Sequence, residues 1–184
     1  MGDKQIDLSK IDRDDLKLLI SKSDINYKVK NISRELTKKF KDKNPIVICV
    51  LNGAFIFFAD LVRNLDFDFE IDFIKLSSYG SKMKSSGTVR MIKDISADVT
   101  NRDVIIVEDI IDTGLTINYL RKRMLDAGVN SISFATCLLK KRKTYKFDFK
   151  IDYIGFKIPD RFVIGYGLDL DQRFRGLDSI YTLK

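Results

Sequence analysis

Apolar positions along the chain fall into two kinds of segment. Ile46–Leu51, Val104–Val107 and Ser131–Leu139 are largely apolar runs, which are typical of strands buried on both faces of a sheet. In Lys22–Phe40 the apolar residues recur at helical spacing, which predicts an amphipathic helix that packs on a sheet. Because extended and helical segments alternate, the pattern predicts an α/β fold with a mostly parallel sheet.

Further helices and strands are expected between and after these segments. Helices are expected over residues 55–64 and 117–127, and Gly128 is placed to end the second in a left-handed conformation. Phe67–Phe73 alternates strictly between apolar and acidic residues, which predicts a strand with one wet face and a structural role for its acids. Three more strands are expected, at Thr88–Ile92, Ile151–Phe156 and Phe162–Tyr166.

The 184 residues are expected to form one domain, 1–184, with 45% hydrophobic and 32% charged residues as in a soluble globular protein. No run of about 18 apolar residues occurs, so no membrane span is predicted. The N-terminus lacks the apolar core of a secretory signal. Cys49 and Cys137 lie in apolar runs, so we expect reduced core thiols in a cytoplasmic protein.

Two features of the composition bear on chemistry. The chain contains no His, which excludes a His general base and a His metal site. Its net charge of +7 suits either a nucleic acid or a small polyanionic substrate, so charge alone does not decide between them.

The most informative stretch is Val104–Thr116. A β-branched run is followed by three carboxylates, at Glu108, Asp109 and Asp112, and then by Thr113-Gly114-Leu115-Thr116 ahead of the helix. The stretch therefore predicts a strand, a turn and a helix, with acids and hydroxyls at the carboxyl end of the strand. In open α/β sheets this end is where ligands bind.

The turn has the chemistry of a site for a phosphorylated sugar. Free N–H groups and the positive dipole at a helix N-terminus attract phosphate, Thr113 and Thr116 offer hydroxyl donors, and Gly114 permits close approach. The carboxylates would repel phosphate and suit ribose hydroxyls, a magnesium ion or a proton transfer. The alternative is that Asp112 caps the helix and the other acids are solvated.

Two other polar stretches follow strand-like runs. Asn52-Gly53-Ala54 could offer backbone N–H groups to an anion, although such a turn is often only a turn. Ser77–Gly87 is rich in Ser and Gly and long for a hairpin, so it is either a mobile loop or a lid.

Val104–Thr116 resembles the signature of the phosphoribosyltransferases that use phosphoribosyl pyrophosphate (PRPP), and its Val-Glu-Asp-Ile-Ile-Asp-Thr-Gly form resembles the hypoxanthine-guanine enzymes. The resemblance covers nearly the whole chain from about residue 20. It implies the type I phosphoribosyltransferase fold, a twisted and mostly parallel sheet flanked by helices. The core would span roughly 20–155, and a small hood would come from the N-terminal segment and roughly 156–184.

The resemblance also implies a role for each matching residue. Asp112 would be the general base and, with Thr113, Gly114, Leu115 and Thr116, would bind the 5′-phosphate. Glu108 and Asp109 would bind the ribose and, with Asp169, Mg²⁺. Pyrophosphate would be bound by Leu51, Asn52, Gly53 and Arg175. A flexible loop would include Ser78 and Tyr79. The purine would be bound by Lys141, Arg161, Phe162, Val163 and Asp169.

Two details of this match concern single positions. The family has a non-proline cis peptide that would here join Leu51 and Asn52, and several members carry Lys where this chain has Asn52. Lys141 matches a Lys that donates to the purine 6-oxo group, which argues against adenine, whose 6-amino group is a donor.

The implied reaction joins hypoxanthine or guanine to PRPP and gives the nucleoside monophosphate and pyrophosphate. The resemblance implies a homodimer or homotetramer, with no nucleic acid or membrane partner. The alternative is a regulatory protein on the same fold that binds PRPP and uses a basic surface, such as that of Lys140–Lys143, to bind RNA.

Overall fold

The computed structural model describes residues 10–79 and 88–184. In chain order its elements are β1 (Leu16–Ile20), α1 (Lys22–Phe40), β2 (Ile46–Leu51), α2 (Phe55–Val62), β3 (Glu70–Tyr79), β4 (Thr88–Lys93), β5 (Asp103–Ile111), α3 (Leu115–Asp126), β6 (Ser131–Lys140), β7 (Tyr153–Ile158) and β8 (Ile180–Leu183).

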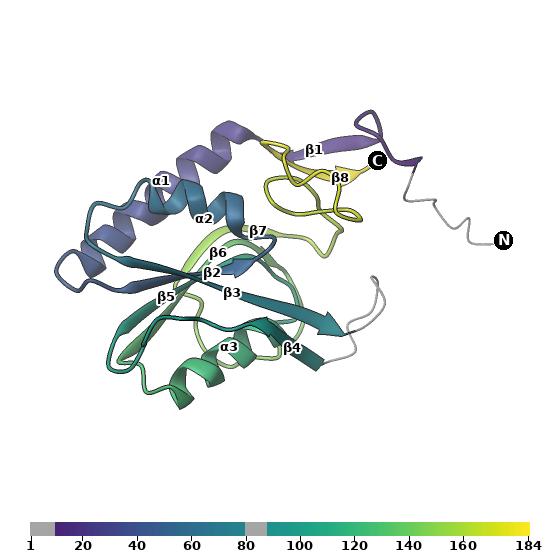
Figure 1. Cartoon of the computed structure of the whole chain (residues 1–184). Helices are drawn as coiled ribbons and strands as arrows, with labels where there is room; N and C mark the ends of the chain where they lie inside the picture. The colour runs from purple at the N-terminus through teal and green to yellow at the C-terminus, as the bar shows by residue number, and fades with distance from the viewer. Residues whose placement is uncertain (1–9, 80–87) are drawn as a thin grey trace.

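The larger sheet has six strands in the order β4-β3-β2-β5-β6-β7, and all of its neighbouring pairs are parallel except β3 with β4. Helices α1 and α2 lie on one face of this sheet and α3 lies on the other (Figure 1). The predicted α/β fold with a mostly parallel sheet is therefore confirmed. Strand β2 and the Val104–Val107 stretch of β5 are apolar throughout because both faces of the sheet are covered there.

Two predicted helices have nearly the predicted bounds. Helix α1 spans the expected Lys22–Phe40, and the Ser21 hydroxyl accepts the Asp24 N–H at 3.2 Å as its cap. Helix α3 begins at Leu115, two residues before the expected start, and Gly128 has the expected left-handed φ of 73°.

Strand β3 corrects the prediction for Phe67–Phe73. The strand starts at Glu70, and it is Asp72 and Ile74 that are buried, while Ile71 and Phe73 are exposed. The buried carboxylate is stable because it accepts the N–H groups of Ser96 at 2.6 Å and Ala97 at 2.8 Å. The structural role expected for the acids therefore holds for Asp72.

The end of β3 also differs from the expected loop. Ser78 and Tyr79 continue the strand, and their backbones pair with Val89 and Thr88 of β4. The rest of the predicted loop, residues 80–87, lies outside the described residues.

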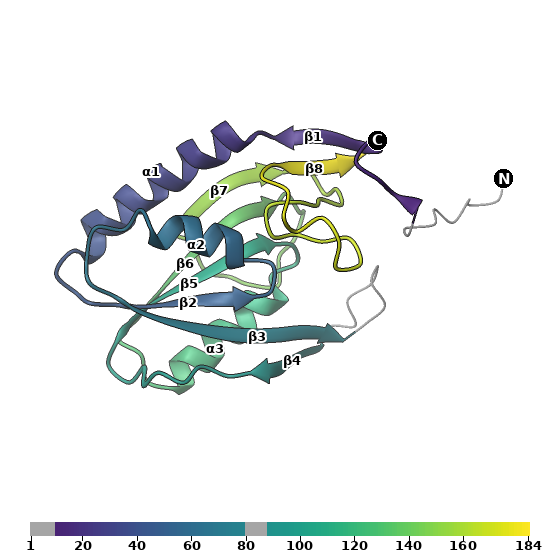
Figure 2. The ribbon, with the colours of Figure 1, turned by 45° about the horizontal axis from the view of Figure 1, so that its top comes forward.

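A smaller unit, which we call the hood, consists of β1, β8 and residues 159–179. Strands β1 and β8 pair antiparallel, and the hood lies beside the carboxyl ends of the parallel strands (Figure 2). The expected strand Phe162–Tyr166 does not form, because the chain turns back at Gly165 and Gly167, with φ of 93° and 98°. The expected core boundary at residue 155 falls inside β7, which belongs to the larger sheet.

Two expectations from composition can be compared with the structure. In the described residues no helix is long and apolar enough to cross a membrane. Cys49 and Cys137 are free and buried, as expected for core thiols.

Candidate active site

The turn between β5 and α3, where the phosphate site is predicted, is built around Gly114. Gly114 is the N-cap of α3 with φ of 88°, and a Cβ at this position would lie 2.1 Å from the Phe147 ring. The Lys146 N–H donates to the Thr113 carbonyl at 2.8 Å. The segment after β6 therefore braces the turn, and glycine is required at its centre.

Asp112 does not cap this helix. Its carboxylate accepts the Lys140 ammonium at 3.1 Å through Oδ2 and the Arg142 Nε–H at 2.6 Å through Oδ1. The interpretation of Asp112 as a helix cap is therefore excluded, and its side chain is available at the edge of the site.

Glu108, which is buried, and Asp109, which is half-buried, form a carboxyl pair near the carboxyl end of β5. Glu108 Oε2 has no hydrogen-bond partner among the described residues, and Asp109 Oδ1 accepts the Ile110 N–H at 2.6 Å. Burial, and then the neighbouring Asp109, raise the pKa of Glu108 well above its ordinary value. Burial also raises the pKa of Asp109. The pair therefore favours a proton or a cation between its oxygens.

A pocket joins this pair to the two predicted anion-binding turns. Its lining comprises Val50, Leu51, Gly53, Leu76, Val89, Glu108, Asp109 and Thr116. Groups from β2, β5 and the start of α3 thus face one space, as expected for the carboxyl edge of parallel strands.

The Leu51–Gly53 turn packs closely against the carboxyl pair and against the hood. The peptide between Leu51 and Asn52 is cis, and the Asn52 residue is exposed. A Cβ on Gly53 would lie 1.5 Å from Asp109 Oδ2, and one on Gly167 would lie 2.0 Å from the Gly53 carbonyl oxygen. The two glycines therefore let the turn approach both the carboxyl pair and the hood.

The hood brings two more predicted residues to the site. Arg175 forms an ion pair with Asp169 at 2.8 Å and donates to the Gly167 carbonyl at 2.8 Å. The Arg175 charge also acts on Asp109, opposing the rise in that carboxyl's pKa. Within residues 10–79 and 88–184, no group of three or more His, Cys, Asp or Glu is placed to hold a metal ion.

The residues predicted to bind the purine differ in their exposure and in their backbone hydrogen bonds. Phe162 is 49% exposed beside the buried Val163, so part of this aromatic residue is accessible to a ligand. Arg161 is exposed, and its N–H donates to the Pro159 carbonyl. Lys141 is also exposed, and its N–H donates to the Ile158 carbonyl at 2.8 Å.

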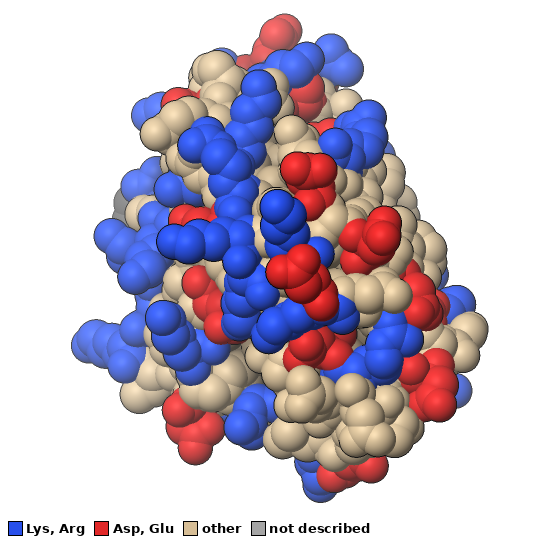
Figure 3. Space-filling model, turned by 90° about the vertical axis from the view of Figure 1, so that its left-hand side faces the viewer, with Lys and Arg blue, Asp and Glu red and all other residues tan. Residues whose placement is uncertain are grey.

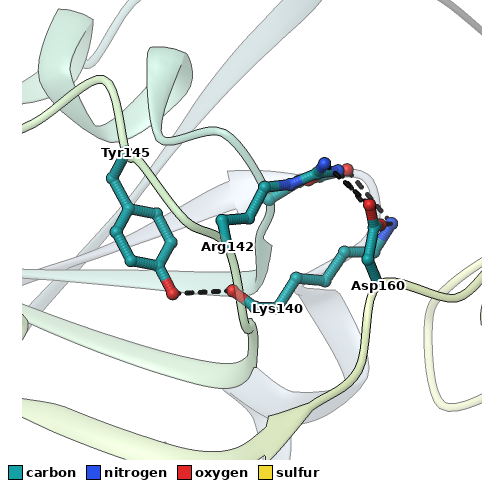
Figure 4. A network of polar contacts seen from close by, with 5 residues as sticks. Lys140, Arg142, Tyr145 and Asp160 are labelled. Atoms are coloured by element: carbon teal, nitrogen blue, oxygen red, sulfur yellow. Dashed lines mark hydrogen bonds and ion pairs between the residues drawn. The ribbon is translucent and has the colours of Figure 1, made fainter.

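The sequence interpretation missed a four-residue ion network, which we call the bridge network: Asp112, Lys140, Arg142 and Asp160 (Figure 4). Side chains alternate along an extended chain, so Lys140 and Arg142 reach the same side and Lys141 does not. The Lys140 side chain is only 13% exposed. The alternation at the end of the Ser131–Leu139 run was the signal that could have identified Lys140.

Together the fold and the site define an α/β enzyme that binds a phosphorylated sugar at the carboxyl edge of its sheet. Residues 21–171 match the family described as the phosphoribosyl transferase domain. Over 168 residues the chain is 46% identical to the hypoxanthine-guanine phosphoribosyltransferase of Bacillus subtilis, with 91% of this chain and 93% of that protein covered. The chain therefore belongs to the phosphoribosyltransferase family, among the hypoxanthine-guanine enzymes.

Solved structures agree with this placement. A hypoxanthine phosphoribosyltransferase from Staphylococcus aureus is 38% identical with a TM-score of 0.86, and the match covers 93% of both chains. A hypoxanthine-guanine phosphoribosyltransferase from Bacillus anthracis is 39% identical with a TM-score of 0.85, covering 91% of this chain and 98% of the other.

Proposed function

We propose that this protein transfers the phosphoribosyl group of PRPP to hypoxanthine or guanine, giving the nucleoside monophosphate and pyrophosphate in purine salvage. The observation that carries the proposal is the convergence of the Thr113–Thr116 turn, the Glu108–Asp109 pair and the Gly53 turn on one pocket. In this proposal the three parts bind the phosphate, the ribose and the pyrophosphate of PRPP, respectively.

Each part has a chemical task in the transfer. The turn at Thr113–Thr116 binds the 5′-phosphate through N–H and hydroxyl donors. Glu108 and Asp109 accept the ribose hydroxyls and stabilise positive charge on the ring as the bond from C1 to pyrophosphate breaks. Asp112 accepts the N7 proton as the purine N9 attacks C1. Arg175 and the Gly53 turn hold the departing pyrophosphate.

For the purine 6-oxo group we assign the donor to Lys140 in place of Lys141. The Lys140 ammonium lies 3.1 Å from Asp112 and 3.4 Å from Asp160, beside the general base and the loop that carries Phe162. An ammonium has three donors, so one remains for the substrate oxygen. Phe162 would stack on the ring, and the Val163 and Asp169 backbones would read its edge.

Magnesium fits the carboxyl pair. Glu108 and Asp109 supply the hard oxygen ligands that Mg²⁺ prefers, and Glu108 Oε2 lacks a partner among the described residues. We propose that these two residues hold Mg²⁺ together with PRPP. Asp169, which the resemblance implied as a third ligand, is paired with Arg175 in the hood and forms no three-acid group with them in the described residues. The ion would neutralise pyrophosphate charge as it leaves.

We also propose a homodimer or homotetramer in the cytoplasm. Phe55, Ile71 and Phe73 are large apolar residues left exposed, and the Phe73 ring packs 5.7 Å from Phe58 in the helix that Phe55 begins. Exposed large apolar residues on neighbouring elements are a feature of association surfaces. Light scattering on the purified protein tests the oligomeric state, and a monomer at all concentrations would contradict it.

The RNA-binding alternative has no support from the relatives, which are named as enzymes. Lys and Arg side chains gather on one face of the molecule, but Asp and Glu are interspersed among them (Figure 3).

The test of the function is a turnover assay with PRPP, Mg²⁺ and each of guanine, hypoxanthine, xanthine and adenine. Product with guanine and hypoxanthine is expected, and no product with either would overturn the proposal.

A further inference from the structure

The bridge network joins three separate parts of the site. Asp112 follows β5, Lys140 and Arg142 lie at the end of β6, and Asp160 lies in the loop that leads to Phe162. Arg142 binds Asp112 through its Nε at 2.6 Å and binds Asp160 through Nη1 at 2.7 Å and Nη2 at 3.0 Å. Arg142 thereby connects the proposed general base to the purine loop.

Arg142 has almost no donor left for a ligand. Its Nη2 also forms an ion pair with Asp112 Oδ1, so all three guanidinium nitrogens lie against the two carboxylates. A guanidinium used in this way fixes the positions of its partners, because its planar fork matches carboxylate geometry. The structure thus gives Arg142 a role in orienting protein groups.

The same contacts distinguish the two oxygens of Asp112. Oδ1 accepts the Arg142 Nε–H and also forms an ion pair with Nη2, so the guanidinium lies directly against this oxygen. Oδ2 accepts once, from Lys140 at 3.1 Å, and keeps one lone pair. Among the described residues, Oδ2 is therefore the oxygen that the guanidinium leaves uncovered and that faces away from Arg142 for a further proton.

We propose that Arg142 and Asp160 are a pair of positioning residues that reserve the Oδ2 atom of Asp112 for the purine N7 proton and hold the Phe162 loop in register with it. The inference rests on the proposed function, because it takes Asp112 as the general base. Asp160 holds Nη1 and Nη2 of the Arg142 guanidinium in place. The guanidinium then fixes the orientation of the Asp112 carboxylate. Neither residue has to touch the purine.

The test uses the full-length protein with PRPP, Mg²⁺ and guanine. We expect Arg142→Gln and Asp160→Asn each to lower turnover by about tenfold or more, because small misplacements of a reacting group are costly. The Michaelis constant for PRPP should change by less than about twofold, because PRPP binding is not touched. The Michaelis constant for guanine should rise, because the Phe162 loop loses its anchor.

Two further variants separate a positioning role from a direct contact with substrate. The double variant Arg142→Gln/Asp160→Asn should lose no more turnover than Arg142→Gln alone, since the two residues act as one unit. Arg142→Lys should restore little, because one ammonium cannot hold both carboxylates. Lys143→Ala, an exposed member of the same basic run, is the matched control and should behave as wild type.

The outcomes separate the inference from the function on which it rests. Losses that multiply in the double variant, full activity in Arg142→Lys, or unchanged turnover in Asp160→Asn would each overturn the inference while leaving the function standing. Absence of guanine turnover in the wild type and in Lys143→Ala would overturn the function itself. If Arg142→Gln fails to fold, the half-exposed Asp160→Asn variant decides alone.

Discussion

Gly53 and Asp109 occupy adjoining space so closely that no side chain fits between them. A Cβ on Gly53 would lie 1.5 Å from Asp109 Oδ2, and the flanking peptide turn faces the same pocket. The Leu51–Gly53 turn and the carboxyl pair are therefore packed against each other, so that a side chain added at Gly53 acts directly on Asp109.

Gly53→Ala should abolish PRPP turnover or lower it by about a hundredfold, because the added methyl group must displace the Asp109 carboxylate. Gly176→Ala is the matched control, because nothing lies within 4 Å of a Cβ there. Steady-state kinetics with both variants check the prediction. Similar kinetics for the two would show that Asp109 can move without loss.

Asp112→Asn should lower turnover by about 10²–10⁴-fold, the usual contribution of a general base. GMP affinity should stay within about tenfold, because the phosphate and stacking contacts survive the change. Turnover and calorimetric GMP binding on the same preparation measure both quantities. Single-turnover kinetics are needed if the steady-state effect is small, because product release limits many enzymes. A normal chemical step would remove Asp112 from the mechanism.

Lys140→Ala should raise the Michaelis constants for guanine and hypoxanthine by about fivefold to a hundredfold, since an unpaired acceptor costs about 1–3 kcal/mol. The Michaelis constant for PRPP should change far less. Lys141→Ala is its neighbour control and should leave purine kinetics near wild type, because Lys141 is exposed. The reverse pattern would return the 6-oxo contact to Lys141.

Glu108→Gln should make the protein more stable at neutral pH while lowering turnover. Burial raises the pKa of Glu108 in the folded state, so its protonated form contributes stability that is full below the ordinary pKa of 4.5. That stability is lost as the pH rises through the folded-state pKa. Thermal melting from pH 4 to pH 9 should therefore show wild type losing stability relative to Glu108→Gln as the pH rises.

Glu35→Gln is the control for the pH series, because Glu35 is an exposed residue of α1. Its melting curve should run parallel to that of wild type. Parallel curves for Glu108→Gln as well would show that the carboxyl pair does not titrate with folding.

The sequence determined the features that depend on neighbouring residues. Helix α1 has the bounds that its apolar spacing and the Ser21 cap predict. The phosphate turn was readable because Val104–Thr116 holds the strand, the acids and the helix start in one contiguous stretch. Interactions within a few residues of chain depend on local conformation, which residue type and spacing largely specify.

Only the tertiary structure decided which side chains meet. Which of Lys140 and Lys141 reaches Asp112 depends on the register at the end of β6, and packing of the strand places Lys140 there. Asp72 is buried because backbone N–H groups more than twenty positions away reach it. Arg142 meets Asp112 and Asp160 only because β5, β6 and β7 end at the same edge of the sheet. The segments that follow these three strands therefore lie close together. Such contacts arise from long-range packing and desolvation, which no local pattern encodes.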